Sequence, residues 1–178
     1  MEHIILIGFK SAGKSSVGIA LAKELKRPFI DLDEKIEQAY KKERGERFSC
    51  REIMKHRGES YFRKLEHKVL NEIITTEEPL VLALGGGAPL EGNNRKLIRE
   101  HKIIEISAPA MVVFDRIMAN GRPSFFPTSE VPLETFQRMW KEREPQYKKL
   151  ADFTIENNDS IQDAVNAVVE KLNEKTYE

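Results

Sequence analysis

The residues with the clearest chemical potential form the segment Gly8–Ser15, GFKSAGKS, which fits the pattern G-x-x-x-x-G-K-[ST]. The segment follows an apolar run, Ile4–Ile7, and precedes a stretch with helical spacing of apolar residues. Glycines let such a loop turn its backbone N–H groups inward, and the next helix adds unpaired N–H groups and the positive end of its dipole. The pattern predicts a nucleoside triphosphate site, with Lys14 on the β- and γ-phosphates and the Ser15 hydroxyl on Mg²⁺. The loop residues expected at the nucleotide are Gly8, Ser11, Ala12, Gly13, Lys14, Ser15 and Ser16.

Two carboxylates follow the second apolar run, Phe29–Leu32. Asp31 and Asp33 are two residues apart, so both side chains point the same way if a strand continues through Asp33. Ligands of open parallel sheets bind at the carboxyl ends of the strands. One carboxylate there suits Mg²⁺ through its water shell, and the other suits a hydroxyl group that attacks phosphorus. The alternative is that Asp33 only caps a helix beginning at Glu34.

Three consecutive glycines, Gly85, Gly86 and Gly87, follow the apolar run Leu80–Leu84. Glycines allow a ligand to approach backbone N–H groups without obstruction by side chains. A plain turn into a helix explains one or two glycines, whereas three favour a ligand site.

Two helical arginines are candidates for binding an anion. Arg63 lies beside an apolar stripe, although it could instead form an i,i+3 surface pair with Glu66. Arg143 lies one turn beyond aromatic residues, before Pro145 is expected to stop the helix, and it could instead be an exposed charge at the helix end.

A third arginine, Arg122, lies between a glycine and a proline in residues 119–131, which have little periodicity. Loops of this length are uncommon in compact domains and are often lids or binding segments. The setting predicts a lid arginine that closes on the transferring phosphoryl group. A disordered surface excursion is the alternative.

The elements that position these residues alternate along the chain. Short apolar runs suit strands buried on both faces, and helix-period stretches separate them. The expected strands are Ile4–Ile7, Phe29–Leu32, Leu80–Leu84, Ile103–Ile106 and Phe153–Ile155. This alternation predicts βαβ units and a parallel sheet in an α/β fold. Residues 34–76 hold more helix than one crossover needs, because Gly45 and Gly58 divide them into three expected helices.

Composition indicates a single domain over residues 1–178. The 29 basic and 29 acidic side chains give zero formal charge, which excludes the strong basic footprint of a nucleic-acid binder. Cys50 is the only cysteine, which fits a reducing compartment. No signal peptide or membrane-spanning segment is evident, so we expect a cytoplasmic protein without membrane partners. The guanine-reading N-K-x-D and switch D-x-x-G patterns of G proteins are also absent from the sequence.

Together these motifs resemble shikimate kinase over nearly the whole chain. The resemblance is carried by Gly8–Ser15, Asp31–Asp33, Gly58–Glu66, Gly85–Gly87, Arg122–Pro123, and Arg143 followed by Pro145, Tyr147 and Ala151–Asp152. It implies a three-layer αβα P-loop kinase fold with a five-stranded parallel sheet, order 2-3-1-4-5, and a mobile lid at about 116–131. It also implies MgATP-dependent phosphorylation of the 3-hydroxyl group of shikimate, a step toward chorismate and the aromatic amino acids.

On the nucleotide side, the resemblance implies that Lys14 and Ser15 hold phosphate and Mg²⁺. Asp31 would lie behind the water shell of the metal. Arg122 would be the catalytic lid arginine on the phosphates, and Arg116 would stack on adenine.

On the acceptor side, the resemblance implies that Asp33 binds the reacting hydroxyl group and acts as base. Arg63 and Arg143 would clamp the shikimate carboxylate, and Gly85–Gly87 would line the ring. Planar guanidinium groups suit a small carboxylate because they bind it with two parallel hydrogen bonds. ATP and shikimate are the expected partners of a monomer.

Some positions depart from the family pattern. Ser11 replaces a common glycine, Ser16 a threonine, and Ser124-Phe125 a pair of leucines. Gluconate kinase, another small-molecule kinase and a catalytically silent ATP-binding module are the alternatives. The triple glycine with F-R-x-x-E argues against the first, and the intact motif residues argue against the last.

Overall fold

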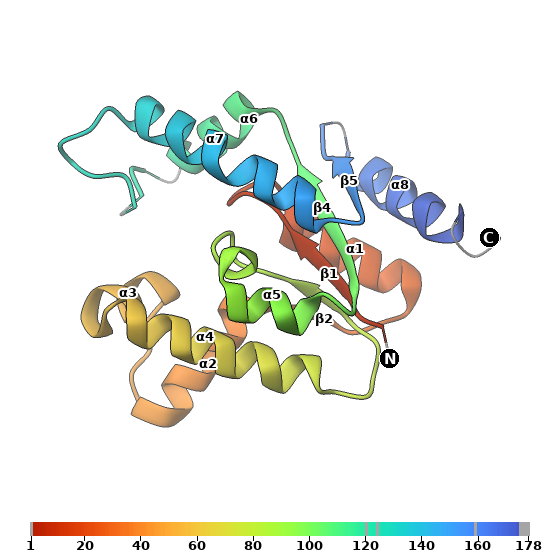
Figure 1. Cartoon of the computed structure of the whole chain (residues 1–178), viewed down its shortest axis with the longest axis horizontal. Helices are drawn as coiled ribbons and strands as arrows, with labels where there is room; N and C mark the ends of the chain where they lie inside the picture. The colour runs from red at the N-terminus through yellow and green to blue at the C-terminus, as the bar shows by residue number, and fades with distance from the viewer. Residues whose placement is uncertain (1, 120, 124, 159, 175–178) are drawn as a thin grey trace.

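The computed structural model describes residues 2–119, 121–123, 125–158 and 160–174, and its centre is a five-stranded parallel sheet (Figure 1). The strands are β1 (Ile4–Ile7), β2 (Phe29–Asp31), β3 (Val81–Ala83), β4 (Lys102–Ser107) and β5 (Phe153–Glu156). They lie in the order β2-β3-β1-β4-β5, so the expected sheet order is confirmed. β1 is central and pairs with β3 on one side and β4 on the other. The loop after β1 therefore emerges at the middle of the sheet's carboxyl edge.

Helices cover both faces of this sheet, which confirms the expected three-layer arrangement. They are α1 (Lys14–Leu25), α2 (Leu32–Arg44), α3 (Cys50–Arg57), α4 (Glu59–Ile74), η1 (Ala88–Leu90), α5 (Gly92–Ile98), α6 (Ala110–Ala119), α7 (Pro132–Leu150) and α8 (Ile161–Glu174). The expected division of residues 34–76 into three helices is confirmed, because Gly45 caps the end of α2 and Gly58 caps the end of α3. Both glycines have positive φ, which glycine adopts without the steric cost of a side chain.

The two faces of the sheet carry separate cores, because successive strand side chains point to opposite faces. On one face, Leu6 and its neighbours pack against α1 and α8. On the other face, Ile5 and Ile7 belong to a larger core that also holds buried residues of α2, α4 and α7. No helix among the described residues is long and apolar enough to cross a bilayer.

The junction between β2 and α2 differs from the expectation of a strand through Asp33. β2 ends at Asp31, and α2 begins at Leu32. The Asp31 carboxylate accepts a hydrogen bond of 3.0 Å from the backbone N–H of Asp33, so it caps the helix. The alternative that Asp33 caps a helix starting at Glu34 is also wrong, because the cap lies two residues earlier. Asp33 therefore projects from the first turn of α2.

Pro145 lies inside α7, which continues to Leu150, so the expectation that it stops the helix is wrong. A proline in a helix interior costs about 3 kcal/mol because one hydrogen bond is lost and its ring crowds the preceding turn. Phe136 and Tyr147, on either side of Pro145, are each 1% exposed. Burial of each such side chain contributes roughly 1.5–3 kcal/mol, which offsets the cost and keeps the helix continuous.

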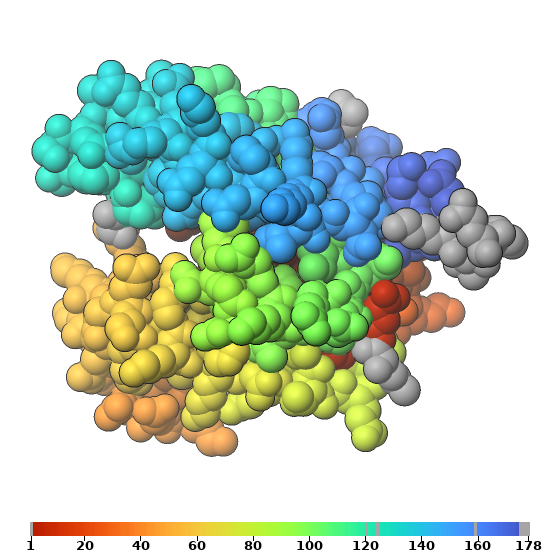
Figure 2. Space-filling view, in the orientation of Figure 1, coloured from red at the N-terminus to blue at the C-terminus, as the bar shows by residue number. Residues whose placement is uncertain are grey.

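Helices α2–α4 form one lobe beside the sheet, and α6 and α7 lie across from it (Figure 1). In the space-filling view, the surface is hollowed between α3–α4, in yellow, and the segment before α7, in cyan (Figure 2).

Candidate active site

The predicted phosphate loop packs closely against the end of β4. Gly8 has φ +138°, and a Cβ atom there would lie 2.2 Å from the carbonyl oxygen of Ile106. Only glycine therefore fits at this close approach. Lys14 begins α1 and is 8% exposed, and its ammonium donates to the carbonyls of Gly8 at 3.0 Å and Phe9 at 2.8 Å. Burial lowers the pKa of Lys14 to about 8, although the charges of Asp33 and Asp31 act in the opposite direction.

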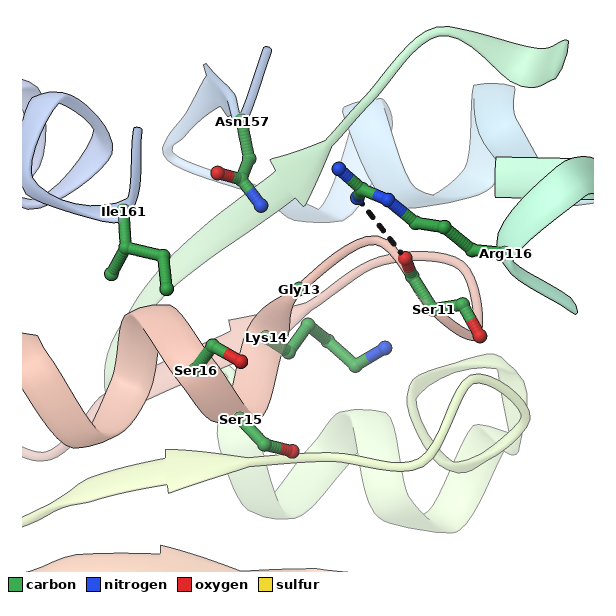
Figure 3. Close-up of a pocket in the computed structure, with 8 residues that line it drawn as sticks. All are labelled: Ser11, Gly13, Lys14, Ser15, Ser16, Arg116, Asn157 and Ile161. Carbon is green, nitrogen blue, oxygen red and sulfur yellow. Dashed lines mark hydrogen bonds between the residues drawn. The ribbon is translucent and has the colours of Figure 1, made fainter. Parts of the chain in front are cut away.

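A cavity of about 430 Å³ opens beside this loop (Figure 3). Its lining consists of Ser11, Gly13, Lys14, Ser15, Ser16, Arg116, Asn157 and Ile161. Arg116, in the last turn of α6, reaches the loop and donates to the Ser11 carbonyl at 3.4 Å. The sequence prediction omitted Asn157 and Ile161. The position of Asn157 just after the last expected strand was the available signal, because the carboxyl ends of parallel strands share one edge. Ile161 begins α8 and carried no such signal.

Ser15 and Asp31 lie together at the mouth of the loop. The Ser15 hydroxyl donates to the Asp31 carboxylate at 2.6 Å. The described residues contain no group of three or more His, Cys, Asp or Glu side chains that could hold a metal ion. Magnesium commonly takes one or two protein oxygens and completes its shell with phosphates and water. The hydroxyl–carboxylate pair therefore fits Mg²⁺ carried by a nucleotide.

Asp33 packs against the first glycine of the run after β3. A Cβ atom on Gly85 would lie 2.6 Å from a carboxylate oxygen of Asp33. Burial, and then the neighbouring Asp31 charge, raise the pKa of Asp33, while Lys14 acts in the opposite direction. A carboxylate with a raised pKa is a better proton acceptor than an ordinary aspartate near neutral pH.

Arg63 packs against the last glycine of the same run. A Cβ atom on Gly87 would lie 2.7 Å from one terminal nitrogen of Arg63. The other terminal nitrogen donates to both carboxylate oxygens of Glu66, at 2.9 and 3.0 Å. The expected i,i+3 pair of Arg63 with Glu66 is therefore present, but it is not a surface pair, because Glu66 is 2% exposed and Arg63 is only partly exposed. The side chains of Asp33 and Arg63 thus contact the two ends of the glycine run.

Asn94 supports this pair from α5. Its side-chain nitrogen donates to Glu66 at 3.1 Å and to the Ala88 carbonyl at 3.1 Å, and His67 lies 2.9 Å from its oxygen. Asn94 is 1% exposed. The sequence prediction missed Asn94 and treated Glu66 only as a partner of Arg63, because helical spacing does not reveal which side of α4 becomes covered.

Arg143, on α7, lies near the phosphate loop. Its guanidinium lies 6.0 Å from the ring centre of Phe9, in the phosphate loop. One turn later on the same helix, the Tyr147 hydroxyl donates to the Gly86 carbonyl at 2.6 Å. The helices that carry Arg63 and Arg143 therefore contact adjacent residues of the glycine run.

Arg122 contacts its own loop. Its guanidinium donates to the carbonyls of Phe126 at 3.3 Å, Pro127, and Glu130 at 2.6 Å. The expected contact with phosphates would require the guanidinium to leave these carbonyls. The ring centre of Phe125, in the same loop, lies 5.6 Å from the ammonium of Lys10 in the phosphate loop.

Comparison with known proteins adds to this geometry. A family model described as shikimate kinase matches residues 10–173. The chain is 35% identical to the shikimate kinase of Francisella tularensis subsp. holarctica over 98% of its length and 97% of the relative. The chain belongs to the shikimate kinase family. A solved shikimate kinase from Acinetobacter baumannii, in complex with shikimate, superposes with a TM-score of 0.86 at 29% identity and covers 100% of this chain and 96% of that chain.

One relative of the shikimate kinase family is longer than this chain. The chain is 30% identical over 97% of its length to the bifunctional shikimate kinase/3-dehydroquinate synthase of Thermotoga maritima, of which it spans 33%. The match therefore covers a part of that protein.

The departures from the shikimate kinase pattern lie at the nucleotide side. Ser11 has φ +65°, a left-handed conformation that costs a non-glycine residue roughly 1–2 kcal/mol. Ser16 lines the cavity beside Lys14. Phe125 is the residue facing Lys10, whereas Ser124 lies outside the described residues.

Proposed function

We propose that this chain transfers the γ-phosphoryl group of ATP to the 3-hydroxyl group of shikimate, giving shikimate 3-phosphate and ADP in the route to chorismate. Family membership supports the reaction class and both substrates. The observation that carries the proposal for these particular residues is the convergence of Asp33 and Arg63 on the glycine run. An acid–base group and an anion-binding group thereby pack against the two ends of the glycine run, Gly85 and Gly87.

Asp33 is the base of the reaction. It accepts the proton of the acceptor hydroxyl as the oxygen forms a bond to the γ-phosphorus and the bond to the β-phosphate bridging oxygen breaks. Its position in the first turn of α2, against Gly85, directs the carboxylate to the carboxyl edge of the sheet. Lys14 balances charge on the phosphates, for which its ammonium leaves the carbonyls of Gly8 and Phe9.

The shikimate carboxylate binds between Arg63 and Arg143. Glu66 accepts from one terminal nitrogen of Arg63 and leaves the other beside Gly87, and Asn94 holds Glu66 in place, so the two residues fix the orientation of Arg63. The glycine run, Gly85–Gly87, lines the ring of the acceptor. A guanidinium with a fixed plane selects a carboxylate by two parallel hydrogen bonds.

The nucleotide occupies the cavity beside the phosphate loop. Ser15 and Asp31 would hold Mg²⁺, which supplies electrostatic stabilisation of the phosphates when it is bound. Arg116 lines this cavity and would stack on adenine. Arg122 contacts the phosphates after its guanidinium leaves the carbonyls of its own loop. Residues 1–178 form one kinase domain, and the protein works as a monomer in the cytoplasm.

The test is a coupled assay of ADP release with shikimate, gluconate and nucleoside monophosphates offered separately. We expect turnover with shikimate only, and no turnover without added Mg²⁺. Turnover with gluconate and not shikimate would replace the proposed acceptor. ATP binding without turnover of any acceptor would favour a silent ATP-binding module.

A further inference from the structure

Asn157 is a buried polar residue at the end of the last strand. It is 8% exposed and directly follows β5, which is an edge strand of the sheet. Its backbone N–H donates to the Ser107 carbonyl at 2.7 Å, so the residue is fixed to the end of β4. Its side-chain nitrogen, Nδ2, donates to the Ala12 carbonyl at 3.0 Å. A side chain that directly follows β5 thus reaches across the end of β4 to the phosphate loop.

The fit between Asn157 and the loop is close. A Cβ atom on Gly13 would lie 2.2 Å from Nδ2 of Asn157, and Gly13 has φ +103°. Glycine at this position is therefore required both by the backbone conformation and by the amide that packs against it. The view of the cavity shows the amide nitrogen of Asn157 directed toward the loop (Figure 3).

The contact at Ala12 has a consequence for the next residue. The carbonyl of Ala12 and the N–H of Gly13 belong to one planar trans peptide, so they point in opposite directions. Asn157 holds the Ala12 carbonyl on its own side of this peptide, so the Gly13 N–H points away from Asn157. Loops of this type bind phosphates with inward backbone N–H groups.

We propose that Asn157 is a positioning residue for the nucleotide phosphates, which holds the Ala12 carbonyl so that the Gly13 N–H faces the bound polyphosphate. The inference rests on the proposed nucleotide site and deepens it. Asn157 acts through the loop and not through the base. The same dependence should therefore appear with a ligand that has phosphates and no base.

The experiment measures binding by calorimetry, without turnover. Wild type, Asn157→Ala and Asn157→Asp are titrated with MgATP, with magnesium tripolyphosphate and with shikimate. Loss of one orienting hydrogen bond should raise the Kd for both phosphate ligands about tenfold in the alanine variant. The aspartate variant should bind still more weakly, because a carboxylate repels the Ala12 carbonyl. The Kd for shikimate should stay within about twofold in both variants.

Asn158→Asp is the matched control. It adds the same charge one residue later, where the side chain is exposed and donates to Glu156 at 2.8 Å. Its Kd for MgATP and for tripolyphosphate should remain within about twofold of wild type. Thermal unfolding of all four proteins separates weak binding from loss of folded protein.

Three results would overturn the inference. Weaker MgATP binding with unchanged tripolyphosphate binding would mean that Asn157 contacts the base. Unchanged binding of both would mean that the loop holds its conformation without Asn157. A parallel loss of shikimate affinity and Tm would assign Asn157 to the fold alone. The proposed function fails on a different result, absence of shikimate turnover by wild type, which leaves this inference standing.

Discussion

The hydroxyl group of Tyr147 donates a hydrogen bond of 2.6 Å to the backbone carbonyl of Gly86 and so joins α7 to the glycine run. Tyr147 is 1% exposed, and burial raises its pKa to about 12, so the hydroxyl keeps its proton at physiological pH. Since Arg143 lies one turn earlier on α7, this bond sets the position of that arginine relative to the acceptor site.

Tyr147→Phe should raise the KM for shikimate about three- to tenfold and leave the Kd for MgATP unchanged, because one neutral hydrogen bond is worth about 1 kcal/mol. Steady-state kinetics with shikimate as the varied substrate measure the effect. The matched control is Tyr40→Phe. Tyr40 is equally buried, and its hydroxyl donates to Glu46 at 2.7 Å, away from the proposed site. Equal changes in the two variants would show that the effect is general destabilisation.

Alanine at Gly85 and at Gly87 should damage different kinetic parameters. The added Cβ of Gly85→Ala displaces the Asp33 carboxylate, which should lower kcat at least about tenfold. The added Cβ of Gly87→Ala displaces the Arg63 guanidinium, which should raise the KM for shikimate at least about tenfold. Gly92→Ala is the control, since nothing lies within 4 Å of its added Cβ. Identical kinetic effects at Gly85 and Gly87 would contradict the separate roles.

The decrease of kcat/KM at acid pH should reflect the protonation of Asp33. Because burial and Asp31 raise its pKa, a base at this position loses its charge at a higher pH than an ordinary aspartate, whose pKa is about 3.9. Activity should therefore rise with pH through this raised value. Asp33→Asn should lower kcat by about 100-fold or more while ATP still binds. The exposed Asp115→Asn serves as control, and near-normal turnover by Asp33→Asn would remove Asp33 as base.

A histidine pair far from the site should make stability depend on pH. The backbone N–H of His3 donates to Nδ1 of His101 at 3.3 Å, and the two rings lie 4.6 Å apart. Burial, and then the charge of His3, lower the pKa of His101 below its ordinary value of about 6.5. The neutral ring is favoured in the folded protein. Its contribution to stability is therefore present above pH of about 6.5 and is lost as the pH falls through the lowered folded-state pKa.

The measurement is the Tm of wild type and His101→Gln between pH 8 and pH 5. The wild type should lose more stability than the variant on acidification. Parallel profiles would mean that another group controls the acid transition.

The sequence located the strands well, because buried parallel strands are continuous apolar runs such as Ile4–Ile7. Strand order came only with the family resemblance, since periodicity does not record which strands pair. Asp33 and Pro145 show the two kinds of error. Asp31 rather than Asp33 caps α2, so this helix begins earlier than expected. The burial of Tyr147 stabilises α7 beyond Pro145, where the sequence predicted that the helix would end.

The candidate site was predictable where a motif fixes local geometry, as at Lys14 and Ser15. The pairing of Arg63 with Glu66 could be anticipated from their spacing, but the burial of Glu66 could not, because identical spacing occurs on exposed helices. The contact of Asn157 with Ala12 joins residues separated by almost the whole chain, and only the folded sheet brings them together.

The two cores on opposite faces of the sheet support different parts of the proposed site, which matters for its redesign. Asp33, Arg63 and Arg143 project from helices anchored in the larger core, whereas Lys14 and Ser15 begin a helix anchored in the smaller one. Repacking beneath α2, α4 and α7 should therefore alter the choice of acceptor alcohol and spare the phosphate donor. Repacking between α1 and α8 should do the reverse. The sheet thus separates the residues that set specificity for the acceptor from those that set specificity for the phosphate donor.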